Sequence, residues 1–146
     1  MESSGISVRE HQPMKIHGQD RPVRWPAEFG RRFLISVDTE EEFDWDAPFQ
    51  RSGHTTVSVP MLRKFQEFIE KYQVKPAYFV DYSIITDPEA AAFLKTVAEQ
   101  KTAEIGVHLH PWVNPPFDER VNDHNSFAGN LPKELEEDKL VELRDT

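Results

Sequence analysis

The stretch RFLISVD at residues 32–38 decides the expected fold, because it is a continuous apolar run that ends in an acid. Its length and its β-branched content predict a buried strand. Two similar stretches follow along the chain, PAYFVD at residues 76–81 and AEIGVHLH at residues 103–110. We expect these to form the second and third strands.

Helices are expected between and after these strands. Apolar side chains recur at helical spacing within residues 57–73, and Pro60 suits the first turn of that helix. Asp87 and Pro88 predict the N-cap and the first position of a second helix, and residues 131–144 predict a last one. Strands that alternate with helices predict an α/β fold with a parallel sheet, either an open layer or an arc of a barrel.

Residues 1–31 differ in character from the rest of the chain. They hold three prolines and three glycines without apolar periodicity, which predicts a flexible N-terminal arm. Residues 32–146 are expected to form the folded part, which is too short for a complete (β/α) barrel of roughly 200 residues or more. Residues 1–32 carry six basic and four acidic side chains, so the acidity of the chain belongs to the folded part.

The composition argues against several classes of function. The net charge of −9 disfavours nucleic-acid binding, because that affinity comes largely from Lys and Arg that neutralise phosphates. No apolar run approaches the roughly 20 residues of a membrane span. The N-terminus lacks the apolar segment of a signal peptide, so a cytoplasmic protein is expected. Since the chain has no cysteine, any metal ion must be held by His, Asp or Glu.

A cluster of acids follows the first expected strand. Asp38, Glu40, Glu41 and Glu42 lie there, and functional groups of parallel α/β folds gather at the carboxyl ends of strands. Carboxylates bind hard metal ions, and together with imidazole they bind borderline ones. The alternative is a solvated acidic loop, which we favour for Glu41 and Glu42. Asp38 differs, because a charge among the buried neighbours of a strand end needs a partner.

Two histidines, His108 and His110, end the third expected strand. Residues i and i+2 of a strand face the same side, so both imidazoles are expected to point into one site that binds zinc or a similar ion. Alternatively, one histidine binds a metal and the other positions substrate, or both are hydrogen-bonded core residues. Trp45 and Trp112 flank the two clusters and suit either stacking on sugar rings or packing of the loops.

Three segments, FLISVDTEEEFDW, PAYFVDY and EIGVHLHPWVNPPF, together resemble the polysaccharide deacetylase family, carbohydrate esterase family four. The resemblance covers residues 33–145 and implies part of a deformed (β/α) barrel. It implies a metal-dependent hydrolase that removes acetyl groups from a polysaccharide, an oligosaccharide or an amino sugar. Zinc is the expected cofactor, with cobalt or nickel as alternatives. By resemblance, Asp38 is the catalytic base, whereas Glu40 and His108 are metal ligands.

The sequence departs from the family pattern after His108. The family usually places two metal-binding histidines four residues apart, but Trp112 stands at that position and His110 is assigned as a ligand from its proximity. The later motifs of the family, which supply an arginine, pocket walls and a general acid, have no full counterpart after Trp112. The chain is therefore expected to be the truncated N-terminal part of such an enzyme, with an exposed sheet edge available for self-association.

Two rival functions stay open from the sequence. An amidohydrolase-type enzyme also uses His-x-His in a barrel, but it carries the pair after its first strand, whereas His108 and His110 follow the third expected strand. A non-catalytic or degenerate carbohydrate-binding α/β domain is the second rival, because the later motifs are missing. Metal titration separates this domain from the enzyme.

Overall fold

The computed structural model describes residues 24–146. The chain divides into two units, Met1–Arg32 and Phe33–Thr146. The described part of the first unit contains one short 3₁₀ helix, η1 (Ala27–Phe29). The expected arm of residues 1–31 lies mostly outside the described residues and stays a prediction. The second unit carries the sheet, the longer helices and the candidate site.

Three short parallel strands form the sheet, in the order β1-β2-β3. They are β1 (Ser36–Thr39), β2 (Ala77–Val80) and β3 (Glu104–Val107). The register aligns Asp38 with Phe79 and Phe79 with Gly106. The predicted α/β fold with a parallel sheet is confirmed. Each strand is shorter than predicted, and His108 and His110 lie just beyond the end of β3 rather than within it.

Helices follow each of the strands within the second unit. They are α1 (Val59–Glu70), α2 (Tyr82–Ile85), α3 (Pro88–Glu99) and α4 (Lys133–Asp145), with the 3₁₀ helix η2 (Ala128–Asn130) before α4. Asp87 caps α3 as predicted, because its carboxylate accepts the N–H groups of Glu89 and Ala90. The sequence did not predict α2, a single turn that begins where the Asp81 carboxylate accepts the N–H of Ile84.

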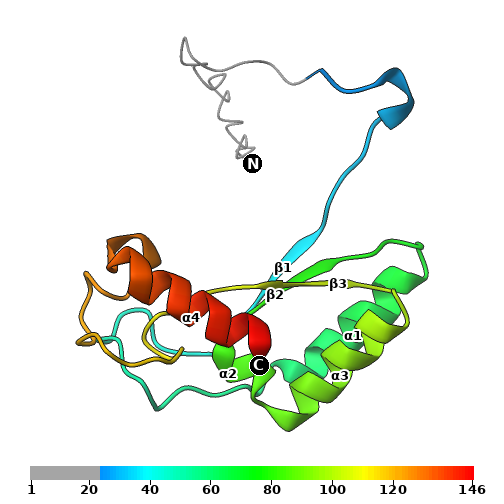
Figure 1. Cartoon of the computed structure of the whole chain (residues 1–146). Coiled ribbons are helices and arrows are strands. Elements are labelled where there is room, and N and C mark those ends of the chain that lie inside the picture. The colour runs from blue at the N-terminus through cyan, green and yellow to red at the C-terminus, as the bar shows by residue number, and fades with distance from the viewer. Residues whose placement is uncertain (1–23) are drawn as a thin grey trace, which may run out of the picture. The chain divides into compact units, whose positions relative to one another are not determined.

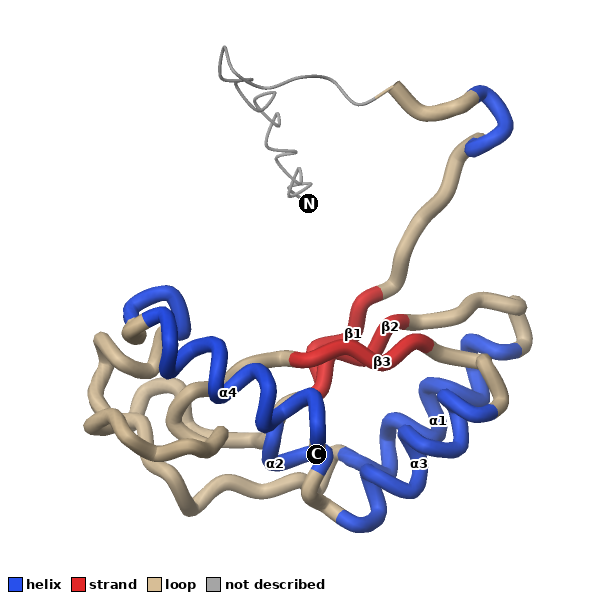
Figure 2. Tube along the Cα trace, viewed as in Figure 1, coloured by secondary structure: helices blue, strands red, loops and turns tan. Residues whose placement is uncertain are grey.

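The hydrophobic core lies between the sheet and the helices α1 and α3, which run side by side beneath the strands (Figures 1 and 2). Strand alternation directs Tyr78 and Val80 of β2 into this core. Helix α3 contributes Phe93, Leu94 and Val97, each almost fully buried. Burial of one such side chain stabilises the fold by roughly 1.5–3 kcal/mol.

The opposite face of the sheet is not covered in this way. Ser36, Asp38 and Glu104 are exposed there, and Phe79 is only partly buried. A Cβ atom at Gly106 would lie 2.8 Å from Cδ1 of Phe79, so the ring requires glycine on the neighbouring strand. The sheet therefore has one apolar face, which helices cover except at Ile105 and Val107 of β3, and one face that presents polar groups.

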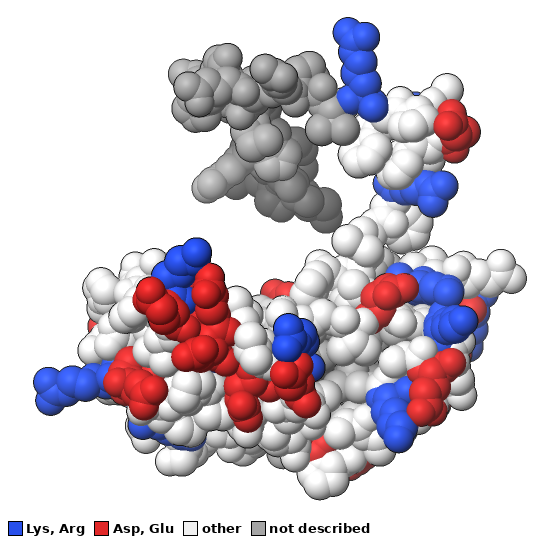
Figure 3. Space-filling model, in the orientation of Figure 1, with Lys and Arg blue, Asp and Glu red and all other residues white. Residues whose placement is uncertain are grey.

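The surface of the second unit is acidic where α4 lies (Figure 3). This helix carries six acidic side chains: Glu134, Glu136, Glu137, Asp138, Glu142 and Asp145. Within residues 24–146, none of the helices combines the length and the apolar character that crossing a membrane requires.

Candidate metal centre

The ends of the three strands bring carboxylates and imidazoles together. Glu40 and Glu41 follow β1, Asp81 follows β2, and His108 and His110 follow β3. Because the strands are parallel, their carboxyl ends meet at one edge of the sheet. Residues that lie far apart in the sequence therefore become neighbours.

The first cluster, here called the outer group, consists of Glu40, His108 and His110. Oε2 of Glu40 lies 3.1 Å from Nε2 of His110 and 3.4 Å from Nε2 of His108. The structure thus brings together all three ligands that the sequence analysis proposed. Glu40 and His108 are each partly exposed, so a water molecule or a substrate could reach an ion held there.

The second cluster, here called the inner group, consists of Glu41, Asp81 and His110, and it is buried. Oε2 of Glu41 lies 3.1 Å from Nδ1 of His110, and Oδ2 of Asp81 lies 3.6 Å from the same nitrogen. Oδ2 of Asp81 also accepts the backbone N–H of Glu41 at 3.0 Å. These three residues could hold a metal ion as well, so the chain offers two candidate ligand sets that share His110.

The expectation of a solvated acidic loop is wrong for Glu41, whose side chain has 0% exposure. One of its oxygens, Oε1, is buried without a hydrogen-bond partner. Asp81 was missed altogether, although it ends the predicted strand of residues 76–81 just as Asp38 ends the predicted strand of residues 32–38. Burial of both carboxylates depends on contacts with distant segments, which the local acidic pattern does not reveal.

Glu42 is partly exposed, but it too is engaged by the protein. Its carboxylate accepts the N–H groups of Val57 at 3.0 Å and Ser58 at 2.7 Å, and the hydroxyl of Thr55. Desolvation alone would raise the pKa of Glu42, but the hydrogen bonds from Ser58, Thr55 and Val57 outweigh it, so this pKa lies below its usual value. Glu42 therefore joins the loop after β1 to the start of α1.

Both ring nitrogens of His110 face carboxylate oxygens at 3.1 Å, Nδ1 toward Glu41 and Nε2 toward Glu40. A neutral imidazole carries only one N–H, so it can donate to only one of them. The contact between Nε2 and Glu40 then joins an acceptor nitrogen to a carboxylate, which a second proton on the ring or a cation beside Nε2 would stabilise. A divalent cation between Glu40, His108 and His110 would supply positive charge there, so the donor set fits such an ion.

Asp38 lies beside the outer group but does not belong to it. Its Oδ1 is 3.7 Å from Nδ1 of His108, which is too long for a hydrogen bond. The expectation that Asp38 is a buried charge is wrong, because its side chain is 66% exposed on the uncovered face of the sheet. Thr39, the next residue, takes the buried position of the alternating strand.

Trp45 and Trp112 have different surroundings. Trp112 is only 5% exposed, and its ring stacks on His110 at 4.3 Å between centroids and 21° between planes. Trp45 is 62% exposed and packs on Phe43 at 4.3 Å. Trp112 therefore holds the ring plane of His110, whereas much of the Trp45 ring is free to contact a ligand.

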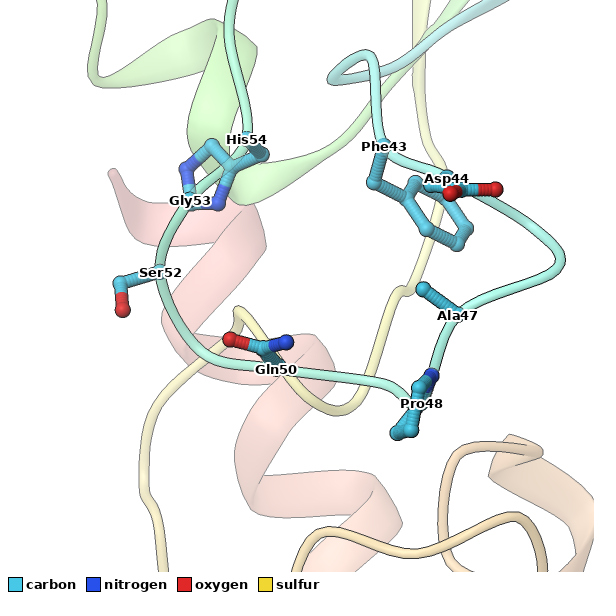
Figure 4. Close-up of a pocket in the computed structure, with 8 residues that line it drawn as sticks. All are labelled: Phe43, Asp44, Ala47, Pro48, Gln50, Ser52, Gly53 and His54. Carbon is cyan, nitrogen blue, oxygen red and sulfur yellow. The ribbon is translucent and has the colours of Figure 1, made fainter.

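A separate hollow lies within the loop of residues 43–54 (Figure 4). His54 and Gln50 form one side of it, opposite Phe43 and Ala47. None of its lining residues belongs to the outer or the inner group. The hollow therefore adds no ligand to the candidate metal centre.

Comparisons with protein-family models, with curated proteins and with solved structures gave no match.

Proposed function

We propose that this chain is a metal-dependent hydrolase that removes acetyl groups from a polysaccharide or an amino sugar. Glu40, His108 and His110 would hold the divalent ion. The observation that carries this proposal is the position of His110, both of whose ring nitrogens face carboxylate oxygens although a neutral ring has one N–H. A cation in the outer group resolves that conflict.

Zinc is the ion that this donor set favours. Two imidazole nitrogens and one carboxylate oxygen are a common set of protein ligands for catalytic zinc, which keeps a further position for water or substrate. Cobalt and nickel accept the same kinds of ligand. The partial exposure of Glu40 and His108 supports a site that small molecules can reach.

A divalent ion held by Glu40, His108 and His110 would polarise the acetyl carbonyl and increase the acidity of a water molecule. Asp38 accepts the proton of the attacking water, a role for which its exposed carboxylate beside His108 is suited. The same proton is returned to the leaving nitrogen or oxygen as its bond to the acetyl carbon breaks, which releases acetic acid and the free amine or hydroxyl. Trp45 offers an exposed ring face on which the apolar side of a sugar can stack. Phe49 and Phe127 line the same hollow as Trp45 and extend this aromatic surface.

The proposal extends to the fold, in which the sheet would be part of a deformed (β/α) barrel. Parallel strands with α1 and α3 on one face support it, because a barrel has its helices outside and its catalytic groups at the strand ends. The edge strand β3, with Ile105 and Val107 partly exposed, would allow self-association. Sedimentation velocity at several concentrations tests this, and a monomer throughout would contradict it.

Metal titration of the metal-free chain is the first test of the function. We expect one zinc or cobalt ion to bind at micromolar or lower concentration, and His108→Ala to weaken binding at least tenfold. His124→Ala is the matched control, because His124 is exposed and belongs to neither group. A chain that binds no divalent ion at micromolar concentration would contradict the proposal.

Acetate release from acetylated amino-sugar oligomers is the second test. We expect Asp38→Asn to bind metal normally but to lose roughly 100-fold or more in rate, the usual contribution of a general base. Undiminished activity of this variant would remove Asp38 from its role. Oligomer binding without any acetate release would favour the non-catalytic carbohydrate-binding alternative.

A further inference from the structure

We propose that Glu41 is a positioning residue, which fixes the proton and the orientation of the His110 ring so that Nε2 is free to bind an ion. This inference rests on the proposed metal site of Glu40, His108 and His110. It assigns a role to a buried acid that takes no direct part in the proposed reaction.

The contact between Glu41 and His110 identifies where the ring proton lies. Of the two 3.1 Å contacts of the ring, only the one between Nδ1 and Oε2 of Glu41 has hydrogen-bond geometry, and Glu41 is fully buried whereas Glu40 is 30% exposed to water. Because a carboxylate oxygen accepts this bond, we place the N–H on Nδ1 of His110. The lone pair then lies on Nε2, which faces Glu40 at 3.1 Å. Glu41 thus selects the tautomer that can serve the outer group.

Asp81 supports this arrangement without replacing Glu41. Its Oδ1 accepts the N–H of Ile84 at 2.8 Å, and its Oδ2 accepts the N–H of Glu41 at 3.0 Å. Its distance of 3.6 Å to Nδ1 of His110 is longer than a hydrogen bond. Asp81 therefore fixes the backbone of Glu41, and Glu41 is the hydrogen-bond acceptor of the ring.

The remaining freedom of the His110 ring is removed by aromatic contacts. Trp112 stacks on one face at 4.3 Å, and Phe43 meets the ring edge-on at 6.1 Å. With the plane set by Trp112, the hydrogen bond to Glu41 determines which nitrogen points outward. Carboxylates that orient metal-binding histidines in this way typically contribute 10- to 100-fold to metal affinity.

The same geometry makes the two ligand sets alternatives rather than two separate sites. An ion in the inner group would have to replace the proton on Nδ1 of His110, and an ion in the outer group needs Nε2 of the same ring. With Nδ1 protonated and donating to Glu41, only the outer group can accept an ion. We therefore expect one ion per chain.

The experiment measures which ring nitrogen of His110 carries the proton in the metal-free chain. Long-range ¹H–¹⁵N correlation spectra at about pH 8, where an ordinary histidine is neutral, distinguish the protonated ring nitrogen from the bare one. The variants are Glu41→Leu, which removes the acceptor, and Glu41→Gln, which keeps an acceptor but removes the charge. Glu67→Gln is the control, because Glu67 is exposed on α1.

We expect Nδ1–H in the wild type and in Glu67→Gln, and a mixture or Nε2–H in Glu41→Leu. Zinc affinity should fall 10- to 100-fold in Glu41→Leu and by less in Glu41→Gln. If Glu41→Leu does not fold, the proposal is judged from the wild-type tautomer and the Glu41→Gln affinity.

Two results would overturn the role of Glu41: Nε2–H in the wild type, or Glu41 variants with wild-type tautomer and affinity. A wild type that shows Nδ1–H but binds no zinc would contradict the proposed function and leave the positioning role intact. The two failures are therefore distinguishable.

Discussion

The second unit contains two interiors of opposite character. Between the sheet and the helices α1 and α3, the buried side chains are almost all apolar. Beyond the strand ends, the buried side chains of the loops and of α4 include Glu41, Asp81, His110, Asn114 and Lys139. The first interior is stabilised by removal of apolar surface from water, and the second depends on each polar atom finding a partner.

Lys139 of α4 shows how the second interior is held together. Its ammonium group has 0% exposure and donates to the carbonyls of Pro111, Asn114 and Pro116 at 2.6–3.0 Å. It also forms an ion pair of 3.1 Å with Glu119. Burial lowers the pKa of Lys139, and Glu119 offsets this only in part. The segment that follows His110 therefore folds against the ammonium group of Lys139.

Replacing Lys139 with Met should have the largest effect on stability. It leaves three carbonyls without their donor and the Glu119 carboxylate without its nearest cation, and breaking a buried ion pair typically costs about 3–5 kcal/mol. Urea denaturation of the variant and of Lys133→Met, an exposed control, measures the difference. A loss below about 1 kcal/mol would mean that the polar interior contributes little to the fold.

Leu94→Ala tests the apolar interior in the same assay. Leu94 is 2% exposed in the core, so its truncation should cost about 2–5 kcal/mol through lost burial and a cavity. Zinc affinity of the folded variant should not change, since Leu94 belongs to neither ligand group. Phe68→Ala on the exposed side of α1 is the control. A changed affinity would show that the two interiors are coupled.

Tyr78→Phe tests the one hydrogen bond that joins the core of β2 to α1. The hydroxyl of Tyr78 donates to Oε1 of Gln66 at 2.8 Å, and leaving this acceptor unpaired should cost about 1–3 kcal/mol. Desolvation, with a contribution from Glu70, raises the pKa of Tyr78 from its usual value of 10.0 to about 12.

Because this pKa is raised, the contribution of Tyr78 to stability should depend on pH. The contribution of Tyr78 is fully present below its unfolded pKa of 10.0 and is lost as pH rises toward the folded value of about 12. The stability difference between wild type and Tyr78→Phe should therefore narrow above pH 10, measured by urea midpoints. Tyr72→Phe, at an exposed position, should show no such narrowing.

Glu42→Gln should have the smallest effect. Because the folded pKa of Glu42 is depressed, its contribution is present above the unfolded value of 4.5 and disappears as pH falls through the lower folded value. Melting temperatures should thus differ from wild type at pH 7 and converge in acid. A difference that persists at pH 2–3 would contradict the assigned cause, and Glu67→Gln should match wild type throughout.

Local patterns were enough to predict much of the apolar interior. The spacing of apolar residues indicated α1, and Asp87 with Pro88 marked the start of α3. The apolar spacing and the capping signal each depend on residues within one or two helical turns of each other. The short helix α2 was not predicted, because its start depends on the Asp81 side chain at the end of β2.

The polar interior was predicted only in part. Sequence alone placed Glu40, His108 and His110 at the ends of parallel strands, because strand order and direction follow from alternating strands and helices. It could not tell that Glu41 is buried and Asp38 exposed, since the two lie three residues apart in one acidic run. The burial of Glu41 involves a contact with His110, which lies 69 residues away along the chain.

The sequence by itself thus determined the parallel α/β architecture and the position of an acid and histidine cluster at the strand ends. Periodicity and capping are local properties, so they can be read without the fold. Only the tertiary structure decided which acids are buried, that Asp81 joins them and that Lys139 lies inside. Burial of a charge depends on partners supplied by distant segments, 40 residues away for the bond between Asp81 and Glu41.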